Sequence, residues 1–264
     1  MSRAIYILLS ILLGLFAIEI ALRLIDPFGV VYFDRIQQYD RYLIEDIARG
    51  YVMGAGIYDF EDWQATINIR HERVTPDSGA GCRVVFLGDS VMFGWGVNDN
   101  ETLVNRLAAI LDIEAVNTGT NGYNIEQVAA TLRAYAADAF VYLAIGNDAD
   151  DTWNLTERQS ARSSAASLSK YLGFLTFHHP QANSAAWHRY TDALGAIQEG
   201  ERLLTFAFDL AYAEYAPGAI LLPMYTSQVS VADGHPDATG HIEIAAAMLP
   251  ALQEHIASNC AEGE

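Results

Sequence analysis

Three polar residues that lie far apart in the sequence could together cleave an ester. Ser90 follows a short apolar run, in the segment Gly88-Asp89-Ser90, and His235 lies near the C-terminus with Asp233 two residues before it. A serine hydroxyl is a poor nucleophile until a base takes its proton, and a histidine held by a carboxylate does so near neutral pH. We therefore predict Ser90 as nucleophile, His235 as general base and Asp233 as orienting acid of an acyl-transfer reaction.

Acyl transfer also needs hydrogen-bond donors for the negative oxygen that develops on the attacked carbonyl. The candidates are the backbone N–H of Ser90, the backbone N–H of Gly122, where no side chain obstructs close approach, and the side-chain amide of Asn147. This chemistry needs no cofactor. The adjacent His178 and His179 lack a spaced carboxylate or cysteine partner, so we expect no metal site there.

Strands and helices alternate through the part of the chain that carries these residues. Short apolar runs predict strands, and apolar residues at helical spacing predict the helices between them. The pattern is typical of βαβ units, so we predict a three-layer α/β/α sandwich with a mainly parallel sheet. Ligands of such sheets bind beyond the carboxyl ends of the strands, where the polar loops of this chain would meet. The predicted strands are 83–88, 114–119, 139–146 and 219–225, and the predicted helices are 101–111, 124–136, 194–216 and 241–257, the last bent or split at Pro250.

Four sequence blocks at these strand ends resemble those of the SGNH (GDSL-type) hydrolases and occur in the same order. The resemblance covers roughly residues 83–258 and implies the SGNH, flavodoxin-like sandwich. It implies that Ser90 is the nucleophile and that Gly122 and Asn147 complete the oxyanion hole. It also implies that Asp233 and His235 complete the triad. The blocks are Gly-Asp-Ser at 88–90, Asn-x-Gly-x-x-Gly at 117–122, Gly-Asn-Asp at 146–148 and Asp-x-His-Pro at 233–236.

The last block departs from the family pattern in two ways. The common spacing is Asp-x-x-His, whereas this chain has Asp233-Gly234-His235, a variant that resembles the polysaccharide O-acetyltransferase and acetylesterase branches. Only about eight residues separate the fourth predicted strand from this block, so the usual last strand would be missing or displaced. Both departures concern Asp233 more than Ser90. Asp89 resembles the family's structural acid.

Other residues near the blocks are expected to be structural. Asp237 is expected to cap the last helix, Asp148 to cap a helix or hold its loop, and His241 to have a structural role. Phe93 and Trp95 are expected to pack under the nucleophile loop, although one of them could line an acyl pocket.

The N-terminal segment 4–25 is almost entirely apolar and, as a helix of about 33 Å, would cross a bilayer core. Glu19 and Arg23 can pair on one helix face, which would neutralise both or serve as a docking site for a partner's transmembrane helix. A cleavable signal peptide is the competing interpretation, but no small-x-small cleavage pattern follows the segment. Arg3 favours a cytoplasmic N-terminus, so the rest of the chain would lie outside the cytoplasm.

The chain divides into three predicted parts. Residues 1–25 are the transmembrane anchor, 26–80 a stalk or N-terminal extension, and 81–264 the hydrolase-like domain with an insertion at about 151–217. Cys82 and Cys260 are the only cysteines. A disulfide between them would suit an oxidising compartment, but two free thiols remain the alternative because sequence does not give their distance.

Composition restricts the partners. The 264 residues are 52% hydrophobic and carry a formal net charge of −18, which argues against nucleic acid because binding phosphates needs clustered Lys and Arg. The N-terminal segment with its Glu19 and Arg23 resembles that of membrane-anchored bacterial envelope proteins, which implies an inner-membrane protein with its main domain in the periplasm. The resemblance also implies an esterase that removes a small acyl group, acetyl above all, from a carbohydrate, lipid or other envelope substrate. Two alternatives remain: an O-acetyltransferase to a glycan hydroxyl, and a non-catalytic subunit of a membrane complex.

Overall fold

The computed structural model divides the chain into two compact units, which are described separately. The first comprises residues 1–41 and 156–180, and the second comprises 42–155 and 181–264. Within them, the residues that the structure describes are 3–26, 42–60, 62–76, 81–149, 184–198, 202–208, 216–230 and 233–260.

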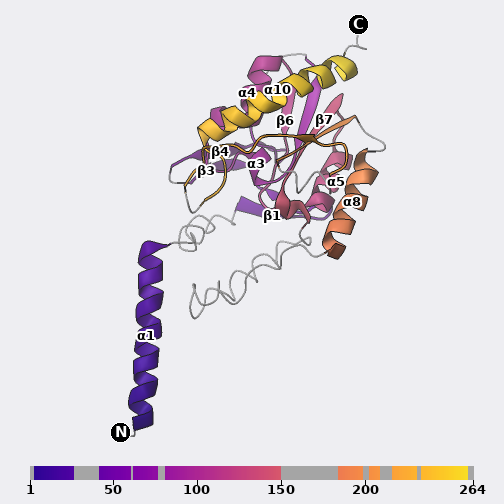
Figure 1. Cartoon of the computed structure of the whole chain (residues 1–264). Coiled ribbons are helices and arrows are strands. Elements are labelled where there is room, and N and C mark those ends of the chain that lie inside the picture. The colour runs from indigo at the N-terminus through magenta and orange to yellow at the C-terminus, as the bar shows by residue number, and fades with distance from the viewer. Residues whose placement is uncertain are drawn as a thin grey trace. The chain divides into compact units, whose positions relative to one another are not determined.

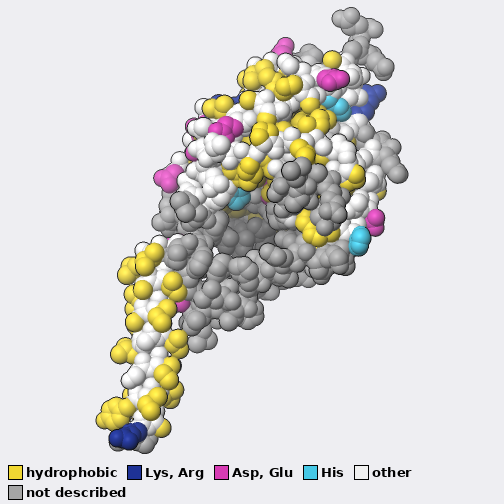
Figure 2. Space-filling model, in the orientation of Figure 1, with side chains coloured by type: hydrophobic (Ala, Val, Ile, Leu, Met, Phe, Trp, Pro, Cys, Tyr) yellow, Lys and Arg dark blue, Asp and Glu magenta, His cyan; other side chains and the backbone are white. Residues whose placement is uncertain are grey.

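Helix α1 (Arg3–Ile25) belongs to the first unit and is apolar along its whole length. None of its residues is buried, and hydrophobic side chains cover its surface (Figure 2). By length and composition it could span a membrane, as predicted. The Arg23 guanidinium donates to Glu19 at 2.7 Å, so the two charges within the helix pair with each other.

The second unit contains a five-stranded sheet in which every neighbouring pair of strands is parallel. Its order is β6-β5-β7-β8-β9. The apolar run of β5 aligns Val85 with Val116 on one side and with Phe140 on the other, so this strand is buried among its neighbours. The strands are β5 (Arg83–Leu87), β6 (Glu114–Asn117), β7 (Ala139–Ala144), β8 (Leu203–Ala207) and β9 (Ile220–Leu221).

Helices cover both faces of this sheet, which confirms the predicted three-layer sandwich (Figure 1). Alternate residues of a strand point to opposite faces. Val84 and Phe86 therefore pack against α4 (Leu103–Leu111) and α10 (Ala238–Cys260), while Val85 and Leu87 pack against α5 and α8. Helix α5 spans Ile125–Ala134, and helix α8 spans Ser184–Gln198.

Two predictions about the later elements were wrong. The segment 194–216 was predicted as a helix, but α8 ends at Gln198 and residues 203–207 form strand β8. An apolar run of this length suits either element, and parallel pairing with β7 decides for a strand. The fourth predicted strand is reduced to Ile220–Leu221, and no further strand follows it in the described residues up to α10.

Helix α10 was predicted to be bent or split at Pro250; it runs through this residue as one element and is not split. Its first turn is capped as expected, because the Asp237 carboxylate accepts the backbone N–H groups of Thr239 and Gly240 at 2.9 Å. Its end is tied to the start of β5 by a disulfide between Cys82 and Cys260, whose Cα atoms are 5.6 Å apart.

Two antiparallel hairpins precede the sheet and belong to the same compact unit. They are β1 (Leu43–Asp46) with β2 (Gly50–Met53), and β3 (Gly56–Asp59) with β4 (Gln64–Ile67). The hydroxyl of Tyr51 on β2 donates to the backbone carbonyls of Asn121 and Gly122, which follow β6. The hairpins therefore support loops at the carboxyl edge of the sheet.

Candidate active site

Ser90 begins the single helical turn α3 (Ser90–Phe93), three residues after β5 ends. The Asp89 side chain caps this turn, because its Oδ1 accepts the backbone N–H of Val91 at 2.9 Å. Gly88 has φ +155°, and a Cβ there would lie 2.8 Å from the Met92 side chain. A glycine is needed at this point for the chain to leave the strand and turn at once into α3.

The structure brings the three predicted triad residues together. His235 Nε2 lies 2.8 Å from Ser90 Oγ, although the two residues are 145 positions apart. On its other side, His235 Nδ1 lies 2.5 Å from Asp233 Oδ1. Asp233 is fully buried, while a quarter of the His235 side chain is exposed. The arrangement can pass a proton from the serine hydroxyl to the imidazole, and the carboxylate can hold the imidazolium that results.

The short Asp-Gly-His spacing is compatible with this geometry. Asp233 Oδ1 accepts two hydrogen bonds from His235, one from the ring and one from its backbone N–H at 3.1 Å. The carboxylate thus closes a local turn around Gly234. Ser230 fixes the start of that turn, because its hydroxyl accepts the backbone N–H of Asp233 at 3.0 Å and its own N–H donates to the Asp233 carbonyl.

The charges around the serine follow from burial and from these donors. Burial raises the pKa of Asp233, but hydrogen bonds from His235 and Trp95 outweigh it, and the pKa of that carboxyl is lowered overall. Burial, with the nearby Asp89 and Asp233 carboxylates, raises the pKa of Tyr225 to about 12, so its hydroxyl stays neutral. The Ser90 hydroxyl has two acceptors within 2.8 Å, His235 Nε2 and Asp89 Oδ2.

Two of the three predicted oxyanion-hole donors are backbone N–H groups of described residues. Neither the N–H of Ser90 nor that of Gly122 donates a hydrogen bond to any described residue. Gly122 has φ +71° in the loop after β6. Asn147 lies in the short helix η3 (Gly146–Ala149) after β7, but its side chain lies outside what the structure describes. Its proposed role therefore stays a prediction.

The glycine-rich loop after β6 lies directly against α3. A Cβ on Gly119 would be 2.2 Å from the backbone nitrogen of Phe93, so no side chain fits there. The Thr120 N–H donates to the carbonyl of Gly88 at 3.2 Å. This close approach brings the loop that carries Gly122 beside the turn that carries Ser90.

Four of the residues expected to be structural are buried, namely Phe93, Trp95, Asp148 and His241. Asp148 holds the turn after β7, since its Oδ2 accepts the Tyr142 hydroxyl and the Ile145 N–H. Phe93 and Trp95 are buried below the nucleophile turn, as expected. Sequence reasoning missed that the Trp95 indole N–H donates to Asp233 Oδ2 at 3.1 Å. The sequence could have suggested only that the indole N–H of Trp95, if buried, needs a hydrogen-bond acceptor, and not which residue supplies it.

The described residues include no group of three His, Cys, Asp or Glu side chains that could hold a metal ion. His178 and His179, which the sequence did not favour as a metal site, lie outside the described residues.

No protein-family model and no curated protein matches the chain. Several solved structures do. A lipolytic G-D-S-L family member from Veillonella parvula is 13% identical, with a TM-score of 0.40, over 63% of this chain and 96% of the other. A carbohydrate acetylesterase family member from Sinorhizobium meliloti is 14% identical, with a TM-score of 0.37, over 66% and 99%.

A family two carbohydrate esterase from Clostridium thermocellum, solved with cellohexaose, is 10% identical, with a TM-score of 0.43, over 70% of this chain and 66% of the other. At such identities and TM-scores, an activity for this chain has to be argued from its own site. The solved structures to which the chain is similar thus include GDSL-type lipolytic proteins and carbohydrate esterases.

Proposed function

We propose that this chain is a serine ester hydrolase of the SGNH type that removes a small acyl group, acetyl above all, from a carbohydrate. The observation that carries the proposal is the continuous line of hydrogen bonds from Asp233 through His235 to Ser90. It lies at the carboxyl edge of the parallel sheet, where the Ser90 N–H has no acceptor among the described residues and the loop that carries Gly122 lies against the nucleophile turn.

The first half of the reaction is acylation. His235 Nδ1 carries its proton toward Asp233, so Nε2 is free to take the proton of the Ser90 hydroxyl. Ser90 Oγ then attacks the ester carbonyl carbon, and the N–H groups of Ser90 and Gly122 stabilise the oxygen that becomes negative. His235 returns the proton to the departing alcohol oxygen, which leaves an acyl group on Ser90.

The second half is deacylation. Water takes the place of the alcohol, and His235 removes one of its protons as it attacks the acyl carbonyl. Collapse of the second tetrahedral intermediate releases the carboxylic acid and restores the Ser90 hydroxyl. A sugar hydroxyl in place of water would make the same site an O-acetyltransferase, so the identity of the acceptor separates these two activities.

The proposal includes membrane anchoring through α1, with the catalytic unit outside the cytoplasm. The length and apolar surface of α1 support the anchor. The disulfide between Cys82 and Cys260 supports an oxidising compartment, since cytosolic thiols are kept reduced. The pairing of Glu19 with Arg23 within α1 leaves these charges less available to a partner helix.

A fluorophosphonate probe tests the proposal, because it reacts covalently with activated serines. We expect labelling of the full-length protein in detergent, none in Ser90→Ala, and normal labelling in Ser258→Ala, a serine near the end of α10 that serves as the control. The unmodified protein should also release acetate from an acetylated oligosaccharide. Absence of labelling and of acetate release in the unmodified, folded protein would refute the enzyme and favour a non-catalytic subunit.

A further inference from the structure

The acid of the proposed triad is held by a second donor besides its histidine, and we propose that Trp95 is a positioning residue for Asp233. The Trp95 indole Nε1–H donates to Asp233 Oδ2 at 3.1 Å, while Oδ1 accepts from His235. Each oxygen of the buried carboxylate therefore has a donor of its own. This inference rests on the proposed function and assigns the orientation of its acid to a residue outside the triad.

Trp95 is part of the same turn as the nucleophile. Its backbone N–H donates to the carbonyl of Ser90 at 2.9 Å, just after α3 ends at Gly94 with φ +87°. One short segment thus carries both the serine hydroxyl and the indole that binds the acid. The distance between nucleophile and acid is therefore set by a direct link, in addition to the link through the imidazole.

An aromatic cluster restrains the Trp95 ring. Phe60 and Trp63, which flank the β3–β4 turn, stack with ring centroids 4.0 Å apart and planes 7° apart. The Trp95 ring meets both edge to face, at 5.5 Å from Phe60 and 5.1 Å from Trp63. Trp95 is only 4% exposed, so rotation of its indole away from the carboxylate would require the hairpin residues to move.

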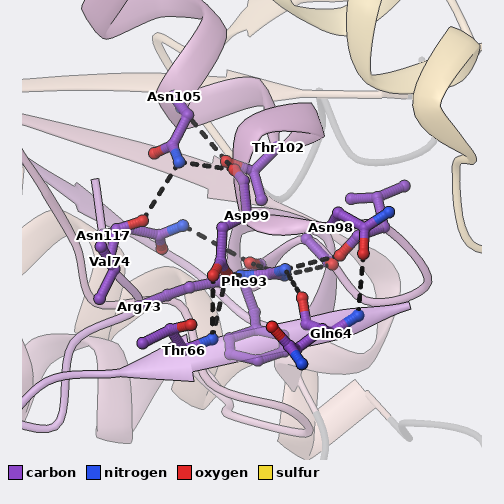
Figure 3. A network of polar contacts seen from close by, with 12 residues as sticks. Gln64, Thr66, Arg73, Val74, Phe93, Asn98, Asp99, Thr102, Asn105 and Asn117 are labelled. Atoms are coloured by element: carbon purple, nitrogen blue, oxygen red, sulfur yellow. Dashed lines mark hydrogen bonds and ion pairs between the residues drawn. The ribbon is translucent and has the colours of Figure 1, made fainter. Parts of the chain in front are cut away.

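Arg73 restrains the backbone on either side of Trp95. Figure 3 shows its side chain in a polar network with Asp99 and Phe93. Its buried guanidinium donates to the carbonyls of Phe93, Gly94 and Val97, at 2.9, 2.5 and 2.6 Å. It also pairs with Asp99 through Nε at 2.9 Å. Burial lowers the pKa of Arg73 to about 10, so the group stays charged at neutral pH. These bonds hold the turn on which Trp95 lies.

A merely structural role for Trp95 and a positioning role lead to different expectations. If the ring only fills space, its replacement should lower stability and leave the chemical step alone. If it orients the acid, loss of the N–H should lower kcat with little change in KM, because the effect falls on the proton transfer and not on substrate binding. It should also displace the acid limb of the pH profile of kcat/KM, which reports the free enzyme's essential base.

The test compares Trp95→Phe with Trp187→Phe. Trp187 lies on helix α8, which packs on the face of the sheet opposite to α3. Both are assayed in the full chain with p-nitrophenyl acetate, alongside their melting temperatures. For Trp95→Phe we expect kcat to fall about tenfold, as for loss of one hydrogen bond to a charged group, with KM within about twofold. We expect Trp187→Phe to keep the kcat and pH profile of the unmodified protein. Equal effects of the two variants on kcat and on the pH profile would overturn the inference.

A second measurement needs no turnover and separates this inference from the proposed function. The indole N–H resonance of Trp95, identified by its absence in Trp95→Phe, should move in Asp233→Asn and stay in place in Asp237→Asn. If the chemical shift of the Trp95 indole N–H is unchanged in Asp233→Asn, the positioning role is overturned, even if the protein is an active esterase. A resonance that moves in a protein that hydrolyses no ester supports the contact and places the failure in the proposed function.

Discussion

Lowering the pH from 7 to 5 should destabilise the second unit in part through His241, near the start of α10. His241 is fully buried. Its Nδ1 accepts the backbone N–H of Leu103 at 3.3 Å, so the ring proton is on Nε2, which has no partner among the described residues. Burial, with the positive charges of Arg73 and Arg106, lowers the pKa of His241 to about 3.

The sign and size of the effect follow from proton linkage. In the unfolded chain this imidazole titrates with its ordinary value of 6.5, so between pH 6.5 and 3 the unfolded state binds a proton that the folded state does not. The free energy of unfolding therefore falls as the pH falls through this window, by about 1.4 kcal/mol per pH unit once well below 6.5. Between pH 7 and pH 5 the loss is about 2 kcal/mol.

Urea unfolding of the full chain in detergent, followed by tryptophan fluorescence at pH 7 and pH 5, measures this loss. The comparison is with His241→Asn, whose side-chain oxygen can still accept the Leu103 N–H but cannot titrate. The variant should be less stable at pH 7 because of the smaller side chain, yet lose about 2 kcal/mol less than the unmodified protein on going to pH 5. Buried carboxyls such as Asp233 contribute equally in both. Identical pH dependence in the two proteins would refute this account of His241.

Three further predictions concern the site and its support. Asp233→Asn should lower kcat by about 10³- to 10⁴-fold while circular dichroism stays unchanged, and a kcat within tenfold of the unmodified enzyme would contradict the triad. Gly119→Ala places a Cβ 2.2 Å from the Phe93 backbone nitrogen, so we expect this variant to lose fluorophosphonate labelling and to melt at a lower temperature. Normal labelling would show that the loop after β6 can move away from α3. Replacing Cys82 and Cys260 by serine opens a loop with a separation of 178 residues and should lower the free energy of unfolding by about 2–5 kcal/mol in urea, whereas unchanged stability would rule out the disulfide.

The sequence predicts part of the candidate site because several of its residues directly follow strongly apolar strands. Val84 to Leu87 form a continuous run that suits a strand buried on both faces, and the polar block 88–90 follows at once. Parallel strands place the blocks that directly follow β5, β6 and β7 at one edge of the sheet.

The supporting residues could not be predicted in the same way, because their roles depend on tertiary contacts. Arg73 lies in an ordinary segment after β4, and only the folded chain places its guanidinium against the carbonyls that follow α3. Strand β8 was missed for a similar reason. Leu203–Ala207 has no pattern that separates strand from helix over five residues, and its pairing with β7 settles the question.

The described residues include no strand between β9 and the last block, and hydrogen bonds replace what such a strand would supply. A strand would fix the backbone that carries the acid and the histidine. Here Ser230 fixes the backbone of Asp233, the carboxylate fixes the backbone of His235, and the indole of Trp95 fixes the second carboxylate oxygen. The two-residue spacing is what permits this, since the Asp233 side chain can reach both the N–H and the ring of its own histidine. Asp233 is thus held by hydrogen bonds with Ser230, His235 and Trp95, and its place beside Ser90 does not depend on sheet pairing.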